Sequence, residues 1–172
     1  MSAAPQGATE VDVAIVGGGL VGASLAAALA GTGVRVLLLE SVPFGAAGQP
    51  SFDERTTALG NASRRIFEAL GVWPALAPEA AAIRSIHVSD AGRFGFARLK
   101  AQEQGLEAFG YVVPNRTLGA ALWGKLHQAP HLSLRVPARL AGLDISAAGV
   151  RDRKSTRLNS SHQCLSRMPS SA

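Results

Sequence analysis

The sequence predicts an α/β fold in which helices pack against a parallel sheet. An apolar run at 11–16 is followed by clustered glycines, an alanine-rich stretch and a second apolar run at 34–39. This order of strand, helix and strand is that of a unit whose two strands run parallel. The 172 residues are 47% hydrophobic and 17% charged, a composition typical of globular proteins rather than of disordered ones.

The first apolar run, Val11–Val16, is rich in Val and Ile and predicts a strand that is buried on both faces. A membrane span or a signal sequence is the alternative for residues 13–34, which carry no charge. That alternative is disfavoured, because no Lys or Arg precedes the segment and six glycines would destabilise a lone helix.

The glycines after this strand match the pattern G-x-G-x-x-G at the point where a helix begins, which is the context in which the motif binds a dinucleotide. Gly17 is expected to allow the tight turn, Gly19 to let the backbone approach a pyrophosphate, and Gly22 to let the helix pack close to the strand. The helix start would offer N–H groups and a positive dipole end to the phosphates. Candidate cofactor-binding residues are therefore Gly17, Gly19, Leu20 and Gly22, and a glycine-rich turn in an ordinary strand–helix–strand unit is the alternative.

The second strand, Val34–Leu39, ends at an acidic residue, Glu40. A carboxylate at this place can accept hydrogen bonds from the ribose hydroxyls of an adenosine, and it would repel the ribose phosphate of NADP. The unit therefore predicts a site for FAD or NAD and leaves that choice open.

The remaining segments continue the α/β pattern. After a Gly- and Pro-containing loop at 41–52, a helix that ends at Gly71 is predicted, with an apolar face made of Ile66, Phe67, Leu70 and Val72. The segments that follow are strand-like at 85–101, extended at 111–115, helical from about Thr117 to Gln128, and a strand at Leu132–Val136. Residues 141–150 predict the first strand and turn of a β-meander, whose edges we expect to be unpaired.

The end of the chain, residues 152–172, loses the apolar alternation and becomes rich in Ser and Arg. Asp152–His162 and Ser166–Ala172 also match the translation of a short-read sequencing adapter. We expect this tail to be non-native and the gene to continue beyond Arg151, with a basic disordered tail as the alternative.

Without the tail, the net charge falls from +5 to +2 and the single cysteine, Cys164, is lost. Nucleic-acid binding is therefore not expected, and neither a disulfide framework nor a thiolate metal site is expected. His127 and His131 lack metal-ligating partners at suitable spacing, so no metal is predicted. His87 is expected to be an ordinary strand residue, and the two tryptophans, Trp73 and Trp123, are expected to pack in a core or an interface.

Five phrases resemble the flavin-dependent aromatic hydroxylases and, within them, the ubiquinone-biosynthesis FAD-dependent hydroxylases, most of all the branch that acts on 2-polyprenyl-6-methoxyphenol. They are DVAIVGGGLVGASLAAAL, FDERTTAL, ALGVW, IHVSDAGRFGF and GYVVPNRTLGAALW, and the resemblance covers residues 10–145. It implies a Rossmann-like FAD-binding domain over 10–151, interrupted at about 83–110 by the start of an interleaved β-rich substrate domain. The chain is then a truncated N-terminal fragment, and residues 1–9 are expected to be disordered.

The resemblance also implies roles for individual residues. The glycines of the motif and Glu40 would hold the ADP half of FAD. Arg55 matches a family arginine near the flavin ribityl chain and pyrophosphate, where a guanidinium donates charge-assisted hydrogen bonds; a solvated residue before a helix is the alternative. Asn115 and Arg116 lie where the family places a polar flavin contact. That family position varies between Gln, Arg and Asn, so the choice between the two stays open, and Asn115 as a helix N-cap is the alternative.

By the same resemblance, the intact enzyme uses NAD(P)H to reduce FAD and O2 to hydroxylate a small-molecule polyprenyl phenol. No catalytic side chain is assigned, because the flavin carries the chemistry, and the fragment alone is expected to be inactive. A cytoplasmic location is expected, with peripheral contact to the inner face of the membrane and to a biosynthetic complex. The alternatives are a hydroxylase of other aromatics, a halogenase, or a non-catalytic dinucleotide-binding module.

Overall fold

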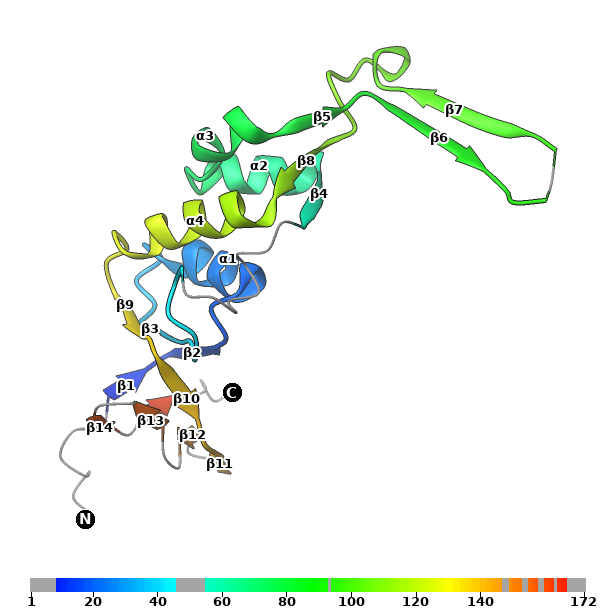
Figure 1. Cartoon of the computed structure of the whole chain (residues 1–172). Helices are drawn as coiled ribbons and strands as arrows, with labels where there is room; N and C mark the ends of the chain where they lie inside the picture. The colour runs from blue at the N-terminus through cyan, green and yellow to red at the C-terminus, as the bar shows by residue number, and fades with distance from the viewer. Residues whose placement is uncertain are drawn as a thin grey trace, which may run out of the picture. The chain divides into compact units, whose positions relative to one another are not determined.

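The computed structural model describes residues 9–45, 55–92, 94–146, 149–152, 155–157, 160–162 and 164–166, with backbone only from residue 151 on (Figure 1). The predictions made on residues 1–8, on the loop at 46–52 and on Asp53 and Glu54 lie outside the described residues. The chain divides into two compact units. Unit 1 comprises Met1–Phe52 and Leu122–Ala172, and unit 2 comprises Asp53–Ala121.

Unit 1 contains a parallel sheet in the order β2-β3-β9, formed by β2 (Val13–Val16), β3 (Val36–Leu39) and β9 (Leu132–Arg135). Val13 pairs with Val36, which pairs in turn with Leu132. Helix α1 (Leu20–Leu29) connects β2 to β3 and contacts both strands. The predicted strand–helix–strand unit and the α/β class with a parallel sheet are therefore confirmed.

The core of unit 1 lies around β3, because all four of its residues are buried. Helix α1 buries three small residues, Ala23, Ala26 and Ala27. Small side chains let a helix approach a sheet closely, since the separation of packed elements depends on the side chains at the contact. The buried face of this alanine-rich helix thus consists of small side chains.

The prediction of one strand over 11–16 with both faces buried is wrong. The segment is divided into β1 (Thr9–Val11) and β2, and Val16 is 59% exposed. The division occurs at Asp12, because Asp12 and Val13 both donate their N–H groups to the carbonyl of Arg35, at 2.9 and 3.2 Å. Two residues facing one is the arrangement of a β-bulge. Strand β2 also lies at one edge of the three-stranded sheet, where the described residues leave part of its surface uncovered.

Two further sheets of unit 1 involve the end of the chain. One has the order β1-β15-β12-β11, with β11 (Leu143–Ser146) antiparallel to β12 (Gly149–Asp152) and β15 (Cys164–Ser166) parallel to β1. The other comprises β10 (Ala138–Leu140), β13 (Ser155–Arg157) and β14 (Ser160–His162). The pairing of β11 with β12 agrees with the predicted strand and turn, but the expectation of unpaired edges is wrong for β12, which also pairs with β15. Backbone geometry does not reveal the origin of a coding sequence, so the non-native origin of 152–172 stays a prediction.

Unit 2 contains an antiparallel sheet in the order β4-β8-β5, formed by β4 (Thr56–Gly60), β8 (Gly110–Pro114) and β5 (Ala81–Ile83). Its helices are α2 (Asn61–Ala69), α3 (Trp73–Leu76) and the 3-10 turn η2 (Ala77–Glu79). Phe67 and Val72 are buried as predicted, but Ile66 is exposed. Successive helical residues point about 100° apart, so the turn of α2 that buries Phe67 directs Ile66 to solvent.

The predicted strand segment 85–101 forms an antiparallel hairpin of β6 (Ser85–Ser89) and β7 (Phe96–Lys100), followed by the 3-10 turn η3 (Gln102–Gln104). The hairpin extends away from the rest of unit 2 as a two-stranded ribbon (Figure 1). Every residue of β7 is exposed. Helix α4 (Asn115–Leu126) begins two residues before the predicted start at Thr117, and the division between the units falls within it.

Candidate cofactor-binding site

The turn between β2 and α1 has the conformation predicted from its glycines. Gly17 has a positive φ of 102°, a conformation that L side chains rarely adopt. Its N–H donates to the carbonyl of Leu39 at 2.8 Å, which ties the turn to the end of β3. Gly19 is the N-cap of α1 and has extended backbone angles.

Gly22 is required by close packing. A Cβ at this position would overlap the carbonyl oxygen of Gly17 and lie 3.2 Å from Cγ2 of Ile15. The backbone oxygen cannot move aside without changing the turn itself. The predicted reason for this glycine, close approach of the helix to the strand, is thus present in the geometry, and the main contact is with the turn.

The N-terminus of α1, which begins at Leu20, is suited to an anion. No side chain of the described residues caps it by a hydrogen bond, and its first turn contains no acidic residue. The first N–H groups of a helix have no partner within the helix and carry the positive end of its dipole. The free N–H groups at the start of α1, next to the turn at Gly17–Gly19, are therefore the part of this site that suits a diphosphate.

Gly18 is a residue of this site that the sequence motif leaves unassigned. It is buried, and its N–H donates to Oε2 of Glu40 at 2.5 Å. Its carbonyl accepts a hydrogen bond from Nε1 of Trp123 at 3.0 Å. Three consecutive glycines were the only signal in the sequence, since Trp123 lies 105 residues away.

Glu40 is 8% exposed, and both of its carboxylate oxygens hold nearby parts of the chain. Besides the bond from Gly18, Oε1 accepts the N–H of Val42 at 2.8 Å and the hydroxyl of Ser41 at 3.3 Å. A carboxylate can accept about four hydrogen bonds, so these contacts leave one acceptor direction for a ribose hydroxyl. The ribose contact itself stays a prediction.

The other three candidate residues lie in unit 2. The N–H of Asn115 donates to the carbonyl of Arg55 at 2.9 Å, so the structure brings these two residues together. Asn115 is buried, and its Oδ1 accepts the hydroxyl of Thr57 at 2.6 Å. Asn115 is the first residue of α4 rather than the residue before it. Arg116 is exposed and forms an ion pair with Glu79 at 3.1 Å. The flavin contacts of these residues stay predictions.

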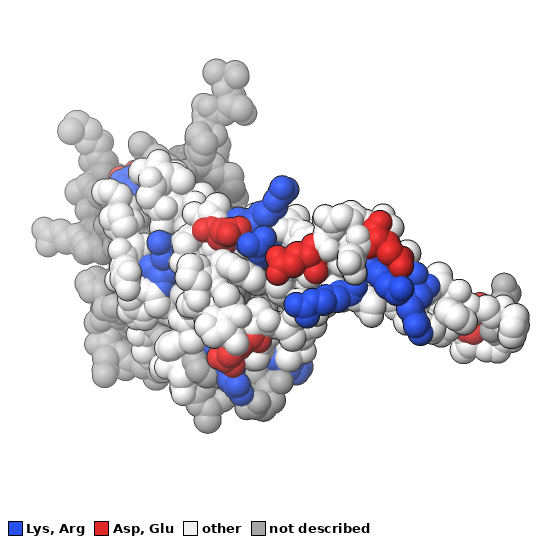
Figure 2. Space-filling model, turned by 90° about the horizontal axis from the view of Figure 1, so that it is seen from above, with Lys and Arg blue, Asp and Glu red and all other residues white. Residues whose placement is uncertain are grey.

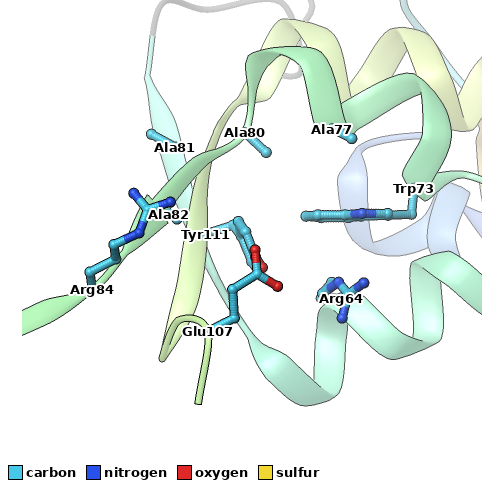
Figure 3. A pocket seen from close by; sticks show the side chains of 9 residues that line it. All are labelled: Arg64, Trp73, Ala77, Ala80, Ala81, Ala82, Arg84, Glu107 and Tyr111. Atoms are coloured by element: carbon cyan, nitrogen blue, oxygen red, sulfur yellow. The ribbon is translucent and has the colours of Figure 1, made fainter. Parts of the chain in front are cut away.

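Unit 2 also has a cavity of about 570 Å³ that none of the candidate residues lines (Figure 3). The guanidinium of Arg64 lies 5.5 Å from the ring centre of Trp73 and 6.0 Å from that of Tyr111. The buried Nε of Arg64 has no hydrogen-bond partner among the described residues. Arg84 and Glu107 line the same cavity with opposite charges, so its electrostatics do not select one class of ligand.

Other polar groups of the described residues have structural partners. Hydrogen bonds from Arg35 lower the pKa of the exposed Asp12 carboxyl to about 2. The ring of His87 stacks on Phe96 at 5.1 Å, and Nδ1 of His127 lies 2.7 Å from the carbonyl oxygen of Trp123. Within the described ranges, no group of three His, Cys, Asp or Glu residues could hold a metal ion.

The surface view in Figure 2 shows basic and acidic side chains next to one another rather than gathered by sign. Ion pairs of the described residues include Lys100–Glu103 at 3.1 Å and Arg64–Glu68 at 3.4 Å. Of the helices in the described part of the chain, none is both long and apolar enough to cross a membrane.

Comparison with known proteins places this geometry in a family. The model of the FAD binding domain matches residues 10–166. The ubiquinone hydroxylase UbiL of Rhodospirillum rubrum is 37% identical over 139 residues, which are 81% of this chain and 32% of that protein. The 3-demethoxyubiquinol 3-hydroxylase of Escherichia coli is 37% identical over 137 residues, 77% of this chain and 34% of that protein. The chain thus spans about a third of the length of these relatives.

Solved structures show the same fold. The flavin-dependent monooxygenase PieE, in complex with FAD and substrate, superposes with a TM-score of 0.73 at 23% identity, over 95% of this chain and 30% of that one. The p-nitrophenol 4-monooxygenase PnpA of Pseudomonas putida gives a TM-score of 0.69 at 17% identity, over 92% of this chain and 39% of that one. The match to the FAD binding domain model decides between FAD and NAD in favour of FAD, and the chain belongs to this family.

Proposed function

We propose that this chain is the FAD-binding part of an NAD(P)H- and O2-dependent flavin monooxygenase that hydroxylates a polyprenyl phenol in ubiquinone biosynthesis. The observation that carries the proposal is the 37% identity to a ubiquinone hydroxylase over 81% of the chain. The solved monooxygenases support the fold and do not bear on the substrate, because their identity to this chain is at most 23%.

The residues of unit 1 support a role in holding the ADP half of FAD. The backbone amides at the start of α1 would receive the diphosphate, and Gly17 and Gly22 allow the tight turn and the close packing that place these amides. The remaining acceptor direction of Glu40 would receive a ribose hydroxyl. Bound FAD supplies the redox and oxygen-transfer chemistry, while the chain binds and orients it.

The residues of unit 2 would contact the rest of the cofactor. Arg55 is proposed to donate charge-assisted hydrogen bonds to the diphosphate or ribityl chain. Asn115 suits a flavin contact better than Arg116, because its amide is buried and oriented by Thr57. Arg116 is exposed and already paired with Glu79.

The proposed substrate also suggests where the enzyme works. A polyprenyl chain partitions into the bilayer, since each buried CH₂ group contributes about 0.8 kcal/mol. We therefore propose a cytoplasmic enzyme that contacts the inner face of the membrane peripherally and associates with other enzymes of the same biosynthesis. Co-sedimentation of the full-length gene product with vesicles, with and without a polyprenyl phenol, tests this point. Absence of binding in both conditions contradicts it.

The function is tested on the full-length product of the gene. Its visible absorption is recorded before and after addition of NADH or NADPH under air, and the products formed from a polyprenyl phenol are analysed by mass spectrometry. We expect flavin bands that bleach with reductant and return in air, and a product heavier by one oxygen atom. Halide incorporation would indicate a halogenase instead. Oxygenation of soluble phenols alone would indicate another aromatic hydroxylase, and nucleotide binding without a reducible flavin would leave only a binding module.

A further inference from the structure

The peptide groups on either side of Gly18 are held by two side chains that are distant in sequence. The Gly18 N–H is bound by the carboxylate of Glu40, which follows β3. Its carbonyl is bound by the indole N–H of Trp123, which lies in α4. Both hydrogen bonds are buried, and Trp123 is almost fully enclosed. Bonds shielded from water in this way hold a backbone segment more firmly than exposed ones.

Gly18 has no room for a side chain, for a reason that differs from that at Gly17. It does not adopt a positive φ, so conformational freedom is not what requires a glycine. A Cβ at this position would instead lie 2.6 Å from Cζ2 of Trp123 and 3.1 Å from Cβ of Glu40. Gly18 is therefore a glycine because the indole packs directly against the turn.

The indole of Trp123 is itself fixed by its surroundings. The ring centre of Phe44 lies 5.5 Å from that of Trp123, and the ring centre of His127 lies 5.9 Å from it. Both pairs of rings are tilted against each other. The neighbouring residues Leu122 and Leu126 of α4 are buried. A hydrogen-bond donor whose rotamer is locked by packing can orient its partner precisely enough for binding.

We infer that Trp123 is a positioning residue for FAD, because its indole N–H sets the direction of the amide that the glycine-rich turn presents to the diphosphate. In a planar trans peptide, the N–H points opposite to the C=O of the same unit. Holding the carbonyl of Gly18 therefore directs the N–H of Gly19 away from the indole. Gly19 is the residue at which the motif lets the backbone approach a pyrophosphate. This inference rests on the proposed role of the turn in binding FAD.

The test compares two tryptophan substitutions in the full-length gene product. Trp123→Phe keeps an aromatic ring but removes the N–H, and Trp73→Phe is the matched control, since Trp73 makes ring contacts and no indole hydrogen bond among the described residues. FAD affinity is measured by equilibrium dialysis, and the thermal midpoint is measured on FAD-free protein. We expect Trp123→Phe to lower FAD affinity about tenfold, as for a buried carbonyl left unpaired, and Trp73→Phe to leave it unchanged.

Equal FAD affinity of Trp123→Phe and wild type would overturn the inference while leaving the proposed function intact. If Trp123→Phe also lowers the thermal midpoint of the FAD-free protein while its FAD affinity stays that of the wild type, Trp123 is a purely structural residue. Failure of the wild type to bind FAD would instead refute the proposed function.

Gly18→Ala tests the same contact from the other side and covers the case in which Trp123→Phe does not fold. Its added methyl group would displace the indole, so FAD affinity should fall at least as far as in Trp123→Phe. When Gly18→Ala and Trp123→Phe are combined, the added methyl group meets a smaller ring. The two losses of FAD-binding free energy should therefore be less than additive. Wild-type affinity in Gly18→Ala, or full additivity in the double variant, would contradict the inference.

Discussion

Strands β3 and β7 both contain large apolar residues, yet every residue of β3 is buried and every residue of β7, Phe96 and Leu99 included, is exposed. Strand β3 lies between two parallel neighbours and contacts helix α1. Strand β7 pairs only with β6 within the described residues. The difference teaches that apolar content predicts where a strand forms, whereas burial depends on the elements that cover it. An isolated two-stranded hairpin is at best marginally stable in water.

The largest effect is expected from a change that prevents α1 from packing near β2 and β3. Gly22→Ala places a methyl group against the carbonyl oxygen of Gly17, a backbone atom that cannot relax. We expect the free energy of unfolding to fall by more than about 3 kcal/mol and FAD binding to be lost. Denaturant titration and equilibrium dialysis measure the two effects.

Gly124→Ala is the matched control for this substitution. Gly124 lies in α4, and a Cβ there would meet no atom within 4 Å. Because Ala is the better helix former, we expect this variant to gain about 0.5–1 kcal/mol. A similar loss of stability in both variants would show that the contact with Gly17 is not the cause.

The contrast between β3 and β7 can be tested directly by replacing one leucine in each strand with alanine. Leu38 of β3 is 0% exposed and Leu99 of β7 is 45% exposed. We expect Leu38→Ala to destabilise the protein by about 3 kcal/mol and Leu99→Ala by less than about 0.5 kcal/mol. Unfolding in urea measures both. A large loss in Leu99→Ala would mean that another surface covers the hairpin, and the contrast between the two strands would then fail.

The smallest effect is expected at the bulge where β1 and β2 divide. The Arg35–Asp12 ion pair is 2.7 Å long, and its hydrogen bonds lower the pKa of Asp12 from 3.8 to about 2. Because the folded-state pKa lies below that of the unfolded chain, the pair stabilises the fold above about pH 3.8, and this contribution is lost as the pH falls through about 2.

Unfolding midpoints of wild type and Asp12→Asn, measured from neutral pH down to this range, check the prediction. The difference between the two proteins should be small, because the pair is exposed, and it should shrink with added salt and vanish at the acid end. A difference that stays constant across this pH range would contradict a role for the Asp12 carboxylate.

Much of the local structure of the candidate cofactor site could be predicted from short stretches of sequence. The conformation of Gly17 and the close packing at Gly22 follow from steric limits among residues a few positions apart, and the end of β3 at Leu39, just before Glu40, follows from its apolar pattern. The elements that were predicted follow one another in the expected order, but the division at Asp12 and the strands β4, β5 and β10 were not predicted. These features depend on local backbone geometry, which a sequence of residues constrains directly.

Other features were decided only by tertiary structure. The exposure of Val16 and Ile66, the bonds of Glu40 to backbone amides, and the contact of Trp123 with Gly18 all depend on which elements meet. The sequence pattern around a tryptophan in an apolar helix is the same whether its ring fills a core or its indole N–H donates a hydrogen bond to a distant carbonyl. Thus the sequence by itself determined the fold class and the conformation of the glycine-rich turn, whereas packing between segments as far as 105 residues apart decided how that turn is held.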